Sequence, residues 1–261
     1  MKTKIMGILN ITEDSFFESS RTNVPEAKER IEKMLQDGAD MIDIGALSSR
    51  PGSKAISEEE EFKRVRGVLD IVKQNRFYEK AIFSIDSYSP LTIDYALNCG
   101  FKIINDITGL SDDDVCVAAK KHKATVCIMH MKGTPQNMQT DPTYEDVVKE
   151  VDEFFIQRVE KAKSFDIEDI ILDVGIGFGK NLNHNVALIK NHFYFLHFGY
   201  PLLVGASRKS MINEILPSAI EERLSGTLAV HIEAVRNKAS IIRCHDVKEH
   251  VQAIRVFEAL Q

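Results

Sequence analysis

The chain has 261 residues, of which 44% are hydrophobic and 28% charged, so it is long enough to bury a large core. Its formal net charge of −6 argues against a nucleic-acid-binding surface, which needs clustered lysine and arginine, but is compatible with a local cationic site for a small anion. The sequence has no signal-peptide pattern and no apolar run of the roughly 20 residues that a membrane helix needs. We therefore expect a cytoplasmic protein without a membrane partner.

Short runs rich in Ile, Val and Leu alternate with longer segments along the whole chain. These runs are shorter than typical helices, and their nearly continuous apolar character is typical of parallel strands buried on both faces. The expected strands are residues 4–9, 40–44, 81–85, 102–105, 125–129, 169–172, 201–204 and 240–243.

Between the strands lie amphipathic segments whose apolar residues recur at helical spacing. Pro25 suits the first turn of its helix, and Gly38 and Gly100 suit helix ends. The acidic run 58–61 is interpreted as the start of a helix. The expected helices include residues 25–37, 57–74, 91–99, 144–164, 222–236 and 247–260.

Eight strands, each followed by helix, predict an α/β fold with a parallel sheet. At this length the pattern favours a single (β/α)₈ TIM barrel over an open doubly wound sheet. No Gly-x-Gly-x-x-Gly motif opens the first helix, so a dinucleotide-binding fold loses its main support. Because no linker or repeat interrupts the pattern, residues 1–261 are expected to form one domain.

Polar side chains occupy the ends of the predicted strands. In a parallel barrel these ends meet at one rim, where active sites are built. A single buried Asp after a strand is often only a helix cap, but eight polar strand ends are harder to explain in this way because unpaired buried charge is costly. In chain order the groups are Asn10, Asp43, Asp86, Asn105-Asp106, His130, Asp173, Ser207-Arg208-Lys209, and Arg243 with His245-Asp246.

These strand-end residues suit two kinds of ligand group. A flat heterocycle with several N–H donors needs fixed acceptors and amides. Such groups are available on Asp86, Asn105 and Asp173. Barrels frequently bind phosphate near their last two strands, and these strands carry positive charge. The cationic residues are Lys209, Arg243 and His245.

Two further motifs have simpler explanations. The glycine-rich segment 175–179 would let a backbone approach a ligand, but a tight turn explains it equally well. Ser207 has no evident His–Asp pairing that would make it a nucleophile, so acyl transfer is disfavoured.

Segments across nearly the whole chain resemble, in order, the signature motifs of dihydropteroate synthases. The first, residues 7–16, reads Gly-Ile-Leu-Asn-Ile-Thr-Glu-Asp-Ser-Phe, and the last, residues 243–247, reads Arg-Cys-His-Asp-Val. The matching segments between them are residues 38–45 with 48–52, 84–87, 104–107, 129–135, 171–180, 203–210 and 222–228.

This resemblance implies that (7,8-dihydropterin-6-yl)methyl diphosphate reacts with 4-aminobenzoate to give 7,8-dihydropteroate, a folate precursor, and diphosphate. It also implies Mg²⁺, a homodimer and a target of sulfonamides. The aryl amine is a weak nucleophile, so departure of diphosphate must lead the reaction. Electron release from the pterin ring makes an SN1-like route plausible, and no strong general base is then needed.

The resemblance also assigns roles to individual residues. Asp86, Asn105, Asp173 and Lys209 would hold the pterin. Arg243, His245 and Asn10 would hold the diphosphate, with Asn10 also a ligand of Mg²⁺. As catalytic residues, Lys209, Arg243 and His245 would stabilise the departing diphosphate. Ser49, Arg50 and Pro51 would lie near the diphosphate and the aminobenzoate, and Ser207 near the benzoate carboxylate.

The chain departs from the family pattern in its first two strand-to-helix loops. Residues 18–20 read Glu-Ser-Ser in place of Asp-Gly-Gly, and Leu47 stands where the family has a carboxylate. We expect loops 12–25 and 48–56 to be mobile without ligand, with Arg50 as their latch. Two alternatives stay open: a methyltetrahydrofolate:corrinoid methyltransferase, which needs no diphosphate site, and a non-catalytic pterin-binding paralogue.

Overall fold

Eight short parallel strands close into a barrel in the computed structural model, which describes residues 2–11, 23–46 and 56–261. Each strand is hydrogen-bonded to its neighbours in chain order, and β8 pairs with β1 to close the ring. The strands are β1 Lys4–Asn10, β2 Met41–Gly45, β3 Ile82–Asp86, β4 Ile103–Asp106, β5 Thr125–Met129, β6 Ile170–Asp173, β7 Leu202–Val204 and β8 Ile241–Cys244. The predicted (β/α)₈ barrel is confirmed, and every expected strand lies within one residue of its observed bounds.

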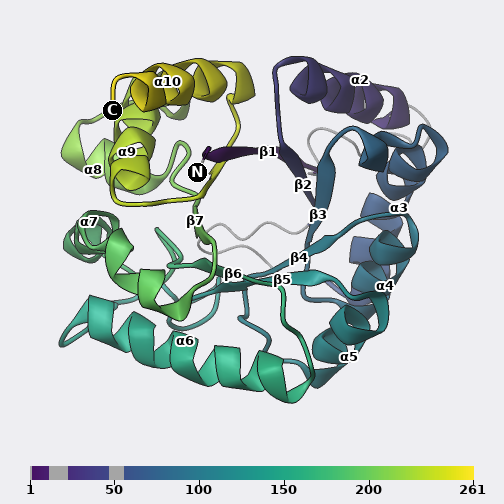
Figure 1. The fold of residues 1–261 in the computed structure, drawn as a ribbon, viewed down its shortest axis with the longest axis horizontal. Helices are drawn as coiled ribbons and strands as arrows, with labels where there is room; N and C mark the ends of the chain where they lie inside the picture. The colour runs from purple at the N-terminus through teal and green to yellow at the C-terminus, as the bar shows by residue number, and fades with distance from the viewer. Residues whose placement is uncertain (1, 12–22, 47–55) are drawn as a thin grey trace.

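Helices surround the ring of strands, as the view along the barrel in Figure 1 shows. They are α2 Asn23–Gln36, α3 Glu58–Gln74, α4 Pro90–Asn98, α5 Asp113–His122, α6 Val147–Ser164, α7 Leu182–Lys190, α8 Ser210–Ile215, α9 Leu224–Arg236 and α10 Val247–Ala259. The described residues also contain three short 3₁₀ helices: η1 Phe77–Glu79, η2 His192–Phe198 and η3 Ile220–Glu222. None of the helices within the described ranges is long and apolar enough to cross a membrane.

Two helices begin later than the sequence predicts, one because of a capping side chain and one because of a 3₁₀ turn. The helix expected from residue 144 begins at Val147, because the Asp146 side chain accepts the N–H groups of Val148 and Lys149. The helix expected from residue 222 begins two residues later, because Ile220–Glu222 forms a 3₁₀ turn.

The barrel closes where β1 meets both the first and the last helices of the ring. Gly7 on β1 faces this junction, and a Cβ atom there would lie 2.9 Å from Val247 Cγ2 on α10 and 3.0 Å from Met34 Sδ on α2. Glycine therefore lets two helices from opposite ends of the chain pack on one strand, and α2 and α10 are neighbours in Figure 1.

Candidate active site

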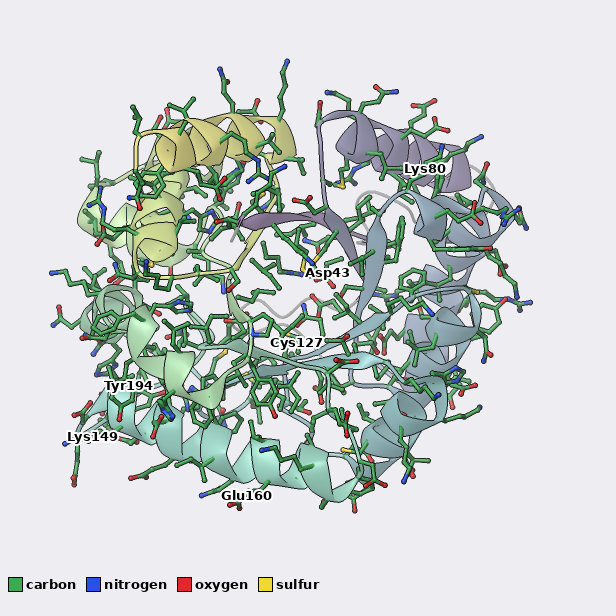
Figure 2. All side chains as sticks on the ribbon, viewed as in Figure 1. Asp43, Lys80, Cys127, Lys149, Glu160 and Tyr194 are labelled. Carbon is green, nitrogen blue, oxygen red and sulfur yellow. The ribbon has the colours of Figure 1, made fainter. Side chains whose placement is uncertain are left out.

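On four strands, the inside of the barrel changes from apolar to polar within two residues. Seven strands contribute one residue each to an apolar cluster: Met6, Met41, Ile103, Cys127, Ile171, Leu203 and Ile241. Side chains alternate across a strand, so residues two positions further on share the same face. On four of these strands that position holds Asp43, Asn105, Asp173 and Arg243. Figure 2 shows Asp43 and Cys127 within the ring, whereas Lys149 and Glu160 lie outside on α6.

Arg243 links two carboxylates across this polar layer. Its Nε donates to Asp43 Oδ2 at 2.6 Å, and its Nη2 donates to Asp86 Oδ2 at 2.7 Å. Asn105 Nδ2 donates to the same Asp43 oxygen at 2.9 Å. Burial alone would lower the pKa of Arg243, but the charges of Asp43 and Asp86 raise it above its ordinary value. The guanidinium is therefore fixed as a cation, and three of its five N–H groups are left for other acceptors.

Asp86 is the last residue of β3 and lies nearer the rim than Asp43, which pairs in register with Ser84. Burial raises the pKa of Asp86, and the Arg243 guanidinium opposes part of that rise. The pKa of Glu61 on α3 is raised to about 7, mainly by burial and in smaller part by the nearby charge of Asp86. The acidic run does start a helix, as expected, with Ser57 as its cap. Its last residue, however, is buried beside the site, which the sequence alone did not indicate.

Asp173 and Lys209 form a second pair of opposite charges. Asp173 Oδ1 accepts the Gly175 N–H at 2.8 Å, which fixes the carboxylate at the end of β6. Lys209 donates to the carbonyl of Ile176 and lies 4.2 Å from the centroid of the Phe178 ring. Burial lowers the pKa of Lys209 to about 8, and the nearby charge of Asp173 opposes that fall.

The loops after β7 and β8 contact each other through polar groups. Ser207 Oγ lies 2.9 Å from His245 Nδ1 and accepts the His245 backbone N–H at 3.3 Å. The guanidinium of Arg208 binds Asp246 with two hydrogen bonds, of 2.6 and 3.1 Å. These bonds hold the loops after β7 and β8 together at one part of the rim.

The glycine-rich segment after β6 packs against the loop after β5. Gly175 has a φ of +67°, and a Cβ atom there would lie 1.9 Å from the carbonyl oxygen of His130. Lys180, 2% exposed, donates toward Nδ1 of His130 at 2.9 Å and toward the carbonyls of His130, Gly175 and Phe178 at 2.9–3.2 Å. The packing of these two loops thus explains the close backbone approach at Gly175. Lys180 holds the two loops together through its hydrogen bonds, a role that the sequence did not indicate.

The structure brings together most, but not all, of the strand-end groups. Asp43, included among those groups but given no binding role, is central to the Arg243 network. Asp106 instead accepts the N–H groups of Thr108 and Leu110 within its own loop, and His130 contacts Lys180. Asn10 is the last residue of β1 and lies at the level of Asp86: Asn10 pairs with Gly45 on β2, and Gly45 pairs with Asp86 on β3. Ser49, Arg50 and Pro51, with most of loops 12–25 and 48–56, lie outside the described residues.

Comparisons with known proteins identify the family of this chain. The model of the family described as "Pterin binding enzyme" matches residues 6–245. The dihydropteroate synthase of Escherichia coli K12 is 44% identical over 258 residues, covering 98% of this chain and 90% of that protein. The bifunctional dihydropteroate synthase/dihydropteroate reductase of Helicobacter pylori is 43% identical over 258 residues, covering 99% of this chain and 68% of that protein.

Solved structures give the same result. A Yersinia pestis dihydropteroate synthase in a sulfonamide drug complex has a TM-score of 0.93 and 40% identity, covering 99% of this chain and 94% of that one. A Xanthomonas albilineans dihydropteroate synthase with 4-aminobenzoic acid has a TM-score of 0.91 and 33% identity, covering 100% of this chain and 93% of that one. This chain therefore belongs to the pterin-binding enzymes and, among them, to the dihydropteroate synthase family.

Proposed function

We propose that this chain joins (7,8-dihydropterin-6-yl)methyl diphosphate to 4-aminobenzoate, releasing diphosphate and forming 7,8-dihydropteroate. The observation that carries the proposal is the division of the site into two parts. Carboxylates and an amide line the barrel interior at Asp43, Asp86, Asn105 and Asp173, and basic groups extend from the same layer to the rim: Arg243 beside the carboxylates, and Lys209 and His245 in the loops after β7 and β8. This division suits a heterocycle that carries an anionic leaving group.

The interior groups have the bonding capacity that a pterin needs. Asp173 uses Oδ1 for the Gly175 N–H, so Oδ2 can accept an N–H from the ring. The amide of Asn105 donates to Asp43, which turns its carbonyl oxygen into the available acceptor. Lys209 supplies a donor held near Asp173. Asp86, Asn105, Asp173 and Lys209 would in this way recognise the heterocycle by complementary hydrogen bonds.

The rim groups would stabilise the charge that develops as diphosphate leaves. Arg243 keeps three N–H donors beyond its carboxylate contacts, and His245 is exposed at the rim next to Ser207. Lys209, with its pKa near 8, still carries a proton at neutral pH. Donors aimed at a developing oxyanion lower the barrier directly, so an SN1-like departure followed by attack of the neutral aryl amine fits this arrangement. Ser207 would then face the benzoate carboxylate.

Mg²⁺ fits this site only together with the diphosphate. Within the described ranges, no group of three or more His, Cys, Asp or Glu side chains could hold a metal ion. Mg²⁺, however, commonly keeps several waters and binds substrate phosphates with one or two protein ligands. The half-buried amide of Asn10 at the end of β1 would be such a ligand. When bound, the ion would neutralise part of the charge on the leaving group.

A direct assay separates this function from its rivals. Purified protein would be supplied with the dihydropterin diphosphate and Mg²⁺, and diphosphate release would be measured with and without 4-aminobenzoate. Release that depends on 4-aminobenzoate, together with pteroate formation, is expected. Pterin binding without release would indicate the non-catalytic paralogue, and release without pteroate formation in the presence of 4-aminobenzoate would indicate a hydrolase. A methyltransferase, which the named relatives disfavour, would show no release.

Arg243→Met and Arg236→Met form a matched pair for this assay. Arg243 belongs to the proposed leaving-group site, whereas Arg236 makes an exposed ion pair with Glu233 on α9. Loss of diphosphate release in the first variant alone supports the assignment. Equal activity of the two variants would contradict it.

We also expect a homodimer that works in the cytoplasm and is inhibited by sulfonamides. Large apolar side chains are exposed on η2, α8 and η3, which suits an interface with a second copy. They include Phe193, Tyr194, Leu196, Ile215 and Ile220, and Figure 2 shows Tyr194 on the outer surface. The mass in solution, measured by light scattering, tests the dimer, and competition between a sulfonamide and 4-aminobenzoate tests the inhibition.

A further inference from the structure

A chain of hydrogen bonds through two buried histidines joins the loops after β7 and β8. His231 on α9 and His250 on α10 are both fully buried, and Nδ1 of His231 lies 2.8 Å from Nε2 of His250. At one end of the chain, the backbone N–H of Ala206 donates to Nε2 of His231 at 3.0 Å. At the other end, Nδ1 of His250 lies 2.6 Å from the backbone carbonyl oxygen of Asp246.

The two ends of this chain determine where both ring protons lie. A backbone N–H can only donate, so Nε2 of His231 must accept and its proton must lie on Nδ1. That proton is donated to Nε2 of His250, whose own proton must then lie on Nδ1 and point to the Asp246 carbonyl. Protonation of His231 would place an N–H against the Ala206 N–H, and protonation of His250 would place one against the His231 N–H. Burial lowers the pKa of both rings, which agrees with a neutral pair.

The ends of the chain lie beside residues of the proposed anion site. Ala206 directly precedes Ser207, and Asp246 directly follows His245. Thr227 lies one helical turn before His231 on α9. Its hydroxyl accepts the backbone N–H of Arg208, two residues after Ala206 in the β7 loop, at 3.0 Å. One face of α9 thus presents two acceptors to the β7 loop, and His250 extends the connection to the β8 loop.

The β7 loop has a shape that needs this support. Arg208 has a φ of +58°, in the left-handed region that a bulky side chain disfavours. Its conformation is held from several sides: by Thr227 at its N–H, by Arg223 at its carbonyl (3.1 Å), and by Asp246 at its guanidinium. An apolar residue in place of His231 would fill the same space but would leave the buried N–H of Ala206 without an acceptor.

We propose that His231 and His250 are positioning residues, which hold the β7 and β8 loops at the spacing that the diphosphate requires. This inference rests on the proposed function, since it assigns the anionic end of the substrate to these loops. The histidines do not touch the substrate. They act through Ala206 and Asp246, and so on Ser207, Lys209 and His245.

Substitution of His231 by Leu and by Gln gives a matched test, because the two side chains are close in size and only Gln offers an acceptor to the Ala206 N–H. In His231→Leu we expect the affinity for inorganic pyrophosphate to fall about tenfold and the KM of the diphosphate substrate to rise in step. Binding of a pterin that lacks the diphosphate should change less than about twofold. His231→Gln should recover most of the pyrophosphate affinity. Equal losses of pyrophosphate and pterin binding, or equal effects of Leu and Gln, would overturn the proposal.

Nitrogen-15 NMR of the histidine-labelled wild-type protein tests the pair without any variant or substrate. Both rings should give the Nδ1–H tautomer at pH 8, and each should titrate below the roughly 6.5 of a free histidine. An Nε2–H tautomer for either ring, or titration of either ring at or above that pH, would refute the chain of hydrogen bonds. Because this measurement needs no turnover, it separates a failure of the positioning role from a failure of the proposed reaction.

Discussion

Arg243→Met tests whether one cation holds two buried carboxylates together. The substitution keeps an unbranched side chain in the barrel but removes the guanidinium that contacts Asp43 at 2.6 Å and Asp86 at 2.7 Å. Asp43 is fully buried and Arg243 is 19% exposed, so water replaces the lost partner poorly. Removal of one partner from a buried ion pair typically costs about 3–5 kcal/mol, and we expect a loss of unfolding free energy of this size at pH 8.

The loss of unfolding free energy in Arg243→Met should be smaller at acid pH, because the folded variant binds a proton more tightly than the unfolded chain does. Without Arg243, only the smaller effect of the Lys209 charge opposes the rise that burial and the charge of Asp43 cause in the pKa of Asp86. The folded variant then binds a proton that the unfolded chain, with an Asp pKa of about 3.9, does not bind near neutral pH. Its stability is therefore lost as the pH rises through the raised pKa of Asp86, by up to about 1.4 kcal/mol per pH unit.

Urea unfolding of the wild type and the variant, followed by circular dichroism at pH 8 and pH 5.5, measures both effects. Arg236→Met is the control, because its ion pair with Glu233 is exposed and should be worth at most about 1 kcal/mol at either pH. A loss below about 1 kcal/mol in Arg243→Met, with no dependence on pH, would show that the three side chains do not form the network described above.

Four further outcomes follow from the site. Asp173→Asn should weaken pterin binding roughly 10–100-fold by calorimetry, and a large fall in melting temperature with unchanged affinity would instead make it a structural residue. Lys180→Met should lower the unfolding free energy by about 3–5 kcal/mol in urea, because it leaves several buried acceptors unsatisfied; a loss under about 1 kcal/mol contradicts that role. Burial holds the pKa of His130 at about 2, below the roughly 6.5 of the unfolded chain. Stability should therefore be complete above pH ~6.5 and fall below it, and His130→Gln should flatten this fall as measured by urea unfolding from pH 7 to pH 4. Chelation should abolish diphosphate release while the circular dichroism stays unchanged, and release that survives both chelation and Arg243→Met would contradict the leaving-group mechanism.

The strands were predictable from the sequence because their signal is local. An apolar run such as 125–129 is buried on both faces whatever its neighbours are, so its composition alone indicates a parallel strand. Helix starts were less certain because they depend on single side-chain bonds. Asp146 and the 3₁₀ turn at Ile220–Glu222 each moved a helix start by two or three residues from the position that periodicity indicated.

The polar contacts of the site depend on partners far away in the chain. Asp43 was visible as a strand-end carboxylate, but its contacts with Asn105 and Arg243 span 62 and 200 residues, and periodicity does not identify partners at that range. His231 and His250 lie on different helices, 19 residues apart in the chain, and helical periodicity does not show that their rings meet. Only the positions of Ala206 and Asp246 reveal what they connect.

The Arg243 network also ties the site to closure of the barrel. Arg243 belongs to β8, which is hydrogen-bonded to β7 and β1, yet its partners lie on β2 and β3, which are not neighbours of β8 in the sheet. The long side chain of Arg243 reaches them across the barrel interior. Without it, Asp43 and Asp86 would lie close together without this cation, an arrangement that like charges disfavour. The strand that closes the barrel against β1 therefore also supplies the cation that the buried carboxylates of β2 and β3 need.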